Sequence, residues 1–131
     1  MFHDLAKYNN NGHLFYERGV DITNLSQNLP NEPGVFYILK RSKKKIKLTY
    51  IGKSDSSKTE NKTLNLLFRD KEKGISLQDF FDKKMKEEDI DSLDIHWFNT
   101  EDDNPSEIAN KLLQNNNDFF GSLPDWNKSF K

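Results

Sequence analysis

Two stretches in the first half of the chain carry the aromatic and β-branched residues that favour extended backbone. The first, GVFYILK, runs from Gly34 to Lys40, and the second, IKLTYIG, runs from Ile46 to Gly52. Only the short polar segment 41–45 separates them. Because such residues prefer strands and so short a link allows only a tight reversal, the pattern predicts an antiparallel hairpin.

A third strand is indicated by strict alternation in SLDIHWF, residues 92–98. Successive side chains of a strand point to opposite faces. Leu93, Ile95 and Trp97 therefore share one face, and the residues between them share the other.

Apolar residues recur at helical spacing in three further segments, 64–68, 77–85 and 108–113. The last helix is expected to begin at Asn104-Pro105, because Asn is a favoured N-cap and Pro is favoured at the first helical position. Residues 1–33 fit a short strand followed by a helical turn.

The order of these elements predicts an α/β fold of the α+β kind, with a small central antiparallel three-stranded sheet flanked by helices. A chain of 131 residues is the size of one domain. We expect a single domain, 1–131, with its core at 34–127 and an N-terminal extension at 1–33.

Composition narrows the class of protein. With no Cys, the chain has no disulfide framework and no thiolate metal site. The polar segment 1–11 lacks the apolar core of a signal peptide, and no run is long enough to span a bilayer. These features lead us to expect a cytoplasmic protein without membrane contact.

The net charge is −1, but the charges are unevenly distributed. Segment 40–58 holds eight Lys and Arg residues against Asp55, whereas segment 87–107 holds nine acids and no Lys or Arg. A local basic block makes nucleic acid a candidate partner even for a chain of neutral overall charge. The alternative is that the Lys run forms a solvated hairpin tip.

Gly52-Lys53-Ser54 looks like the end of a phosphate-binding P-loop. That motif requires a Gly five residues before its second Gly, and Lys47 occupies this position. The residues between them favour a strand rather than a loop. The sequence therefore argues against a P-loop.

Gly34-Val35-Phe36 and Tyr50-Ile51-Gly52, on neighbouring predicted strands, resemble the two tripeptides that name the GIY-YIG nuclease domain family. The family pattern continues with an Arg after the second strand, a Glu on a later helix and an Asn in an irregular segment. Arg69, Glu107 and Asn127 occur in that order here.

The resemblance implies a metal-dependent endonuclease that hydrolyses phosphodiester bonds of DNA, in preference to RNA, with one divalent cation, Mg²⁺ or Mn²⁺. It makes Glu107 the metal ligand, Arg69 the phosphate clamp and Asn127 a residue that positions groups by hydrogen bonds. It makes Tyr50 the general base. Because a free phenol has a pKa of about 10, Tyr50 would need cations such as Lys53 nearby.

Other residues are expected to contact the nucleic acid. Phe36 would form an aromatic wall on the same face as Tyr50, and four cations would bind phosphates: Lys43, Lys44, Lys45 and Lys58. Phe36 stands where the family carries Tyr, so one active-site hydroxyl is missing. The alternative function is therefore a catalytically degenerate module of the same fold that binds nucleic acid or a protein partner. A homodimer or a separate recognition subunit would supply further contacts.

Each of the four principal residues also has a structural interpretation. Glu107 stands three residues after Asn104 and could only complete a helix start. Arg69 could be a surface residue, Tyr50 a strand aromatic and Asn127 a turn residue. The nuclease hypothesis requires these four residues to converge on a single concave surface. The structural interpretation has no such requirement.

Overall fold

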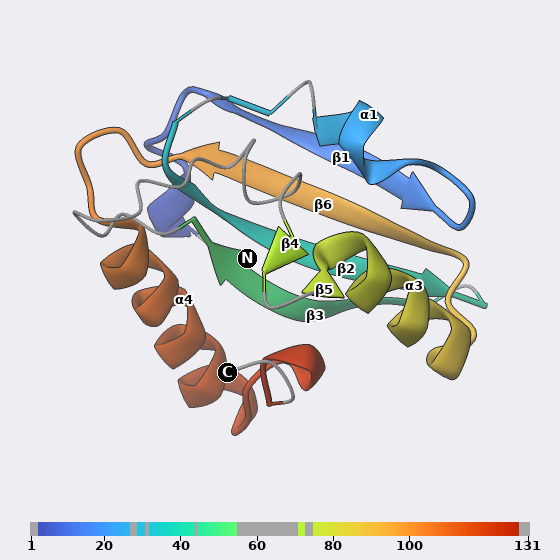
Figure 1. Cartoon of the computed structure of the whole chain (residues 1–131). Helices are drawn as coiled ribbons and strands as arrows, with labels where there is room; N and C mark the ends of the chain where they lie inside the picture. Colours follow the sequence, from blue (N-terminus) through green and yellow to red (C-terminus); the bar gives the residue numbers. More distant parts are fainter. Residues whose placement is uncertain are drawn as a thin grey trace.

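The computed structural model describes residues 3–26, 29–30, 32–43, 45–54, 71–72 and 75–128. The elements follow the chain in the order η1 (His3–Leu5), β1 (Asn11–Glu17), α1 (Ile22–Ser26), β2 (Gly34–Ser42), β3 (Lys45–Lys53), β4 (Lys71–Glu72), β5 (Ile75–Ser76), α3 (Leu77–Glu88), β6 (Ser92–Asn99), α4 (Pro105–Phe120) and η2 (Asp125–Lys128) (Figure 1).

Four strands form one antiparallel sheet in the order β1-β6-β2-β3, and β4 pairs with β5 separately. The predicted hairpin is confirmed as β2 and β3, and the third predicted strand is confirmed as β6. The expectation of a three-stranded sheet was wrong. β1, from the segment expected to precede the core, pairs with β6 from Asn11–Phe98 to Glu17–Ser92. Without β1 this edge of β6 would lack backbone partners.

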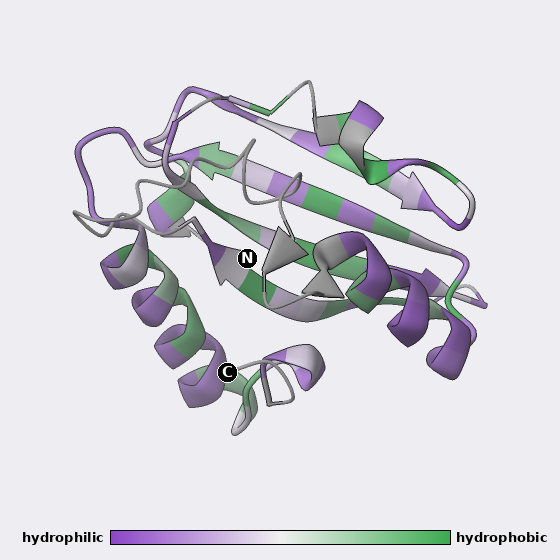
Figure 2. Cartoon of the chain, viewed as in Figure 1, coloured by the Kyte–Doolittle hydropathy of each residue, from purple (hydrophilic) through white to green (hydrophobic). Residues whose placement is uncertain are grey.

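The side of the sheet that we call the α3 face carries the larger core. Phe36, Ile38 and Tyr50 lie on this face and belong to one buried cluster with Phe81 and Met85 of α3. Figure 2 shows the alternation of hydrophobic and hydrophilic residues along β6 that separates this face from the other. The predicted division of β6 is confirmed, because Leu93, Ile95 and Trp97 are buried, whereas the residues between and after them, Asp94, His96 and Phe98, are half-buried.

On the opposite side, the α4 face, α4 packs over β2 and β3, and Leu5 of η1 belongs to the same buried cluster. Val35 and Ile51 of the sheet pack there with Ala109 and Leu112 of α4. Adjacent residues on one strand thus serve different cores. The side on which a helix lies therefore decides which strand residues it can reach.

Helix α4 begins and ends as its sequence indicates. The side chain of Asn104 accepts a hydrogen bond from the Ser106 backbone N–H at 2.8 Å, which confirms the predicted N-cap. Gly121, with a φ of 76°, ends the helix in a left-handed conformation that suits glycine, and its N–H donates to the Asn117 carbonyl at 2.7 Å. α3 confirms the helix predicted at 77–85, while the helix predicted at 64–68 lies outside the described residues.

In the part of the chain that the structure describes, no helix combines the length and the apolar character needed to cross a bilayer.

Candidate functional site

Tyr50 lies on β3 with its side chain in the core beneath α3. Only 8% of the residue is exposed, and its ring packs against Phe36 with the ring centroids 5.8 Å apart. Burial raises the pKa of Tyr50 to about 12. A general base at neutral pH needs the opposite change, because a phenol with this pKa holds its proton more firmly than a free one.

Phe36 is on the same face as Tyr50, as predicted, and this confirms the assigned strand register. It does not form a wall open to a ligand, however, because only 1% of the residue is exposed. Its ring instead lies over Gly52, its partner on β3. The predicted contact between Phe36 and substrate is therefore wrong.

Glu107 lies in the first turn of α4 and is exposed. The buried residues of α4 include Pro105 and Ala109, and at roughly 100° per residue Glu107 projects from the opposite side of the helix. In addition, α4 packs beside Ile51 on the α4 face, whereas Tyr50 belongs to the α3 face. The expected convergence of Tyr50 and Glu107 is therefore wrong, because the two lie on opposite sides of the sheet.

The divalent cation implied by the family resemblance has a single expected ligand, Glu107. Among them, no group of three or more His, Asp or Glu side chains is arranged to hold a metal ion. Because the resemblance implies one carboxylate rather than such a group, the divalent cation stays a prediction.

Asn127 makes the hydrogen bonds expected of it, but to the protein's own backbone. Its Nδ2 donates to the Ile51 carbonyl and its Oδ1 accepts from the Ile51 N–H, both at 2.9 Å. The side-chain amide thereby pairs with the backbone N–H and carbonyl of Ile51 on the outer edge of β3, as a neighbouring strand would. Its side chain is buried and holds η2 against the sheet.

Three other predicted site residues, Arg69, Lys44 and Lys58, lie outside the described residues. Lys53 is described, and it is exposed at the end of β3.

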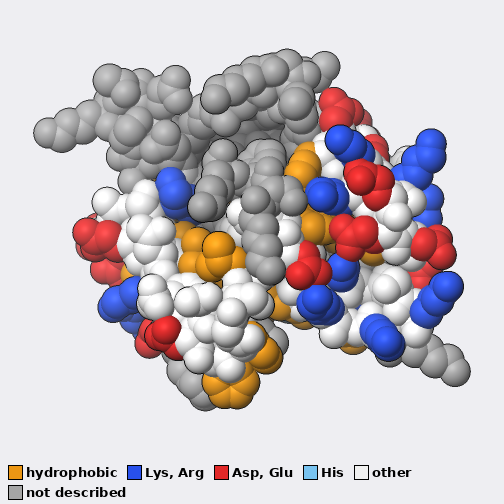
Figure 3. Space-filling model, turned by 90° about the horizontal axis from the view of Figure 1, so that it is seen from below, with side chains coloured by type: hydrophobic (Ala, Val, Ile, Leu, Met, Phe, Trp, Pro, Cys, Tyr) orange, Lys and Arg blue, Asp and Glu red, His pale blue; other side chains and the backbone are white. Residues whose placement is uncertain are grey.

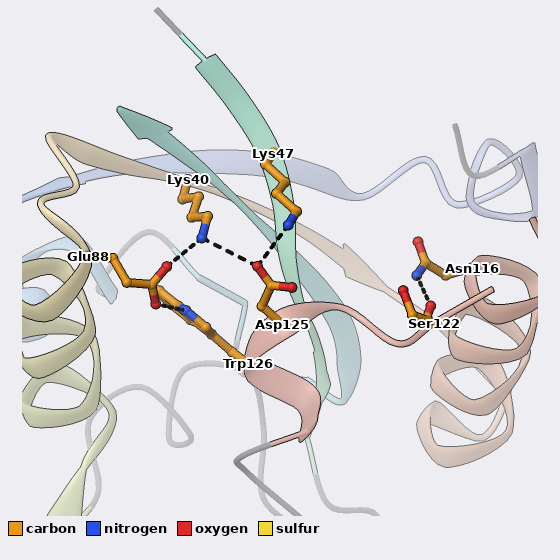
Figure 4. Close-up of polar contacts among 7 residues, drawn as sticks. All are labelled: Lys40, Lys47, Glu88, Asn116, Ser122, Asp125 and Trp126. Atoms are coloured by element: carbon orange, nitrogen blue, oxygen red, sulfur yellow. Dashed lines mark hydrogen bonds and ion pairs between the residues drawn. The ribbon is translucent and has the colours of Figure 1, made fainter. Parts of the chain in front are cut away.

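Two lysines of the basic block are tied into a polar network beside η2 (Figure 4). Lys40 pairs with Glu88 and lies 3.5 Å from Asp125, and Lys47 lies 2.9 Å from Asp125. The indole N–H of Trp126 donates to the other oxygen of Glu88 at 2.8 Å. Although burial acts to raise it, the hydrogen bonds from Lys40 and Trp126 hold the pKa of Glu88 below its usual value. These two lysines therefore fasten η2 to β2, β3 and α3.

The remaining cations of the hairpin have a different environment. Within the described ranges, Arg41, Lys43 and Lys45 are exposed and none of them forms an ion pair. Lys43 has a φ of 42° at the turn itself. Figure 3 shows acidic and basic side chains intermingled on the side of the molecule that carries α3. Unpaired cations thus gather at the hairpin end.

The α4 face also contains a row of rings over β1, β6 and β2 that the sequence analysis did not identify. His13, His96 and Tyr37, which we call the ring row, are partners across three strands. The ring centroids of His13 and His96 lie 5.5 Å apart with an interplanar angle of 19°, and those of His96 and Tyr37 lie 4.8 Å apart at 10°. The alternation of β6 placed His96 on this face, but the pairing of β1 was needed to bring His13 beside it.

Asp94 and Phe15 extend this surface. One Asp94 oxygen lies 3.2 Å from His13 Nδ1 and the other lies 3.1 Å from His96 Nε2. Phe15 is 41% exposed, and the guanidinium carbon of Arg41 lies 5.8 Å from the centre of its ring. An exposed aromatic surface therefore adjoins the hairpin cations.

Comparison of the chain with models of known protein families, with characterised proteins and with solved structures gives no match in any of the three.

Proposed function

We propose that this chain is a nucleic-acid-binding module that contacts phosphates through the end of the β2–β3 hairpin and performs no cleavage through Tyr50 and Glu107. The observation that carries the proposal is the division of the hairpin cations. Lys40 and Lys47 are held by carboxylates, whereas Arg41, Lys43 and Lys45 are exposed without an ion pair in the described residues.

Unpaired cations suit this role for a physical reason. A Lys or Arg that approaches a phosphate releases counterions from the nucleic acid, and this release supplies much of the binding free energy. A lysine that must first leave a carboxylate partner loses part of that gain. The cations at the hairpin end meet no such cost, which favours them over Lys40 and Lys47.

Replacing Lys43, Lys44 and Lys45 with Gln tests this proposal. Affinity for labelled DNA, measured by fluorescence anisotropy, should fall for all sequences alike, because phosphate contacts carry no direct base information. On duplex DNA the slope of log K against log salt should lose about 0.9 for each phosphate contact removed.

The matched control replaces three exposed helix lysines, Lys83, Lys86 and Lys111, with Gln and changes the net charge equally. It should leave affinity close to that of the wild type. Equal weakening in both variants would mean that only overall charge matters, and the proposal would fail.

Hydrolysis of DNA with Mg²⁺ or Mn²⁺ is the second candidate, favoured by one observation. The two tripeptides do lie side by side, with Phe36 paired to Gly52. The test is nicking of supercoiled plasmid by the wild type and by Glu107→Ala with either cation. Nicking that disappears in Glu107→Ala would favour this candidate over the binding module.

A further inference from the structure

The ring row ends at an open edge of the sheet. β1 is an edge strand, and the His13 side chain is 64% exposed. Because His13 is the outermost ring of the row, no strand of the described residues lies beside the ring face turned away from His96. A planar group from a ligand could continue the stack there.

Phe15 offers a second ring on the same strand and the same face. It stands two residues from His13, so both side chains project toward the same side of β1, roughly 7 Å apart. Arg41 lies over its ring and adds a cation at that point. Two exposed rings and one guanidinium therefore lie together on the uncovered part of the α4 face.

Charge complementarity indicates the occupant of this surface. Both oxygens of Asp94 already lie within hydrogen-bond distance of an imidazole nitrogen, so this carboxylate is engaged within the face itself. Glu17 is the other acid of this face in the described strands, and it lies at the same end of the sheet as Arg41, because both residues pair with Ser92 of β6. Arg41, Lys43 and Lys45 border the rings at this same end and outnumber that single carboxylate. A ligand with planar rings on an anionic backbone matches this arrangement.

We propose that this surface binds single-stranded nucleic acid, with unpaired bases stacked on His13 and Phe15 and the adjoining phosphates held by Arg41. The inference deepens the proposed function and rests on it. A base stacked within a duplex has no free face to offer, whereas an unpaired base can lie flat on an exposed ring. The surface therefore favours single strands over duplexes, and stacking makes it tolerant of sequence.

The experiment compares a short labelled single strand with the duplex of the same sequence, as DNA and as RNA, by fluorescence anisotropy on the full chain. The wild type should bind the single strand more tightly. His13→Ala with Phe15→Ala should weaken single-strand binding by about tenfold or more for each ring, since each stacked base contributes that much. The same double variant should leave duplex binding and its salt slope unchanged.

Ring-retaining variants separate stacking from folding. His13→Phe and Phe15→Tyr keep a planar ring at each position and should retain the single-strand preference, and circular dichroism should show all variants folded. Equal loss of single-strand and duplex binding in the alanine variant would overturn the inference, as would a wild type without preference.

The outcomes also separate this inference from the proposed function. If the lysine variant weakens both forms while the ring variant changes neither, the phosphate-binding function stands and the stacking surface is refuted. If the wild type binds neither form at low salt, both proposals fail, and a protein partner becomes the better explanation of the exposed rings.

Discussion

The ring of Phe36 lies over Gly52 across the β2–β3 ladder, so that a Cβ at position 52 would stand 2.3 Å from Phe36 Cζ. The other outer strand repeats this arrangement, because a Cβ on Gly12 would stand 2.8 Å from the ring of its partner Trp97. Trp97 and Phe36 are themselves partners. The glycine that ends Tyr50-Ile51-Gly52 therefore has a packing role that requires no catalysis.

Gly52→Ala should destabilise the protein by about 1–3 kcal/mol, because the added methyl group forces the buried Phe36 ring to move. Denaturant unfolding followed by fluorescence would measure the loss. The double variant Gly52→Ala with Phe36→Leu should lose less than the sum of the two single changes, since a smaller side chain removes the clash. Additive losses would contradict the packing role.

Asn127→Ala should cost about 2–5 kcal/mol of unfolding free energy, because the N–H and the carbonyl of Ile51 would both lose a buried partner. Asn127→Asp should also destabilise, since a carboxylate can accept from the N–H but cannot donate to the carbonyl. Asn115→Ala, at an exposed position of α4, is the control and should change little. A loss at Asn127 no larger than at Asn115 would refute the edge-covering role.

Tyr50 should make stability fall at high pH. Because its pKa is raised to about 12, the folded state retains a proton that the unfolded state loses near the usual phenol pKa of about 10. This contribution is fully present below about pH 10 and disappears as the pH rises through about 12. Denaturation midpoints at about pH 9 and about pH 11 should diverge less in Tyr50→Phe than in the wild type. An identical fall in both proteins would mean that Tyr50 is not buried as described.

Glu107→Ala should change the unfolding free energy by no more than about 0.5 kcal/mol, because the side chain is exposed and projects away from the sheet. The favourable interaction of its charge with the helix N-terminus contributes only a few tenths of a kcal/mol. Thermal melting of the two proteins side by side measures the change. A loss above about 2 kcal/mol would show that Glu107 has a buried partner.

Local patterns were sufficient to predict the hairpin, β6 and α4. Alternation marked the buried face of β6, and Asn104-Pro105 marked the start of α4, because both signals lie within a few neighbouring residues. β1 was harder to recognise as part of the sheet, since only Leu14 and Tyr16 of its seven residues are buried.

The candidate site depended on information that no local pattern contains. Tyr50 and Ile51 are neighbours, yet only the side on which α4 packs determines which of them it approaches. The hydrogen bonds of Asn127 and the stacking of His13 on His96 likewise join residues far apart in sequence. Family resemblance supplied the residue types, but their relative positions come from the tertiary packing.

The salt dependence of nucleic-acid affinity in the wild type tests the central claim most directly. Three cations at the hairpin end, Arg41, Lys43 and Lys45, should neutralise about two or three phosphates, so log K should fall against log salt with a slope of roughly −2 to −3 on duplex DNA and slightly less on a single strand. Anisotropy titrations at several salt concentrations give this slope. No binding at low salt, or an affinity that stays flat as salt rises, would contradict the account.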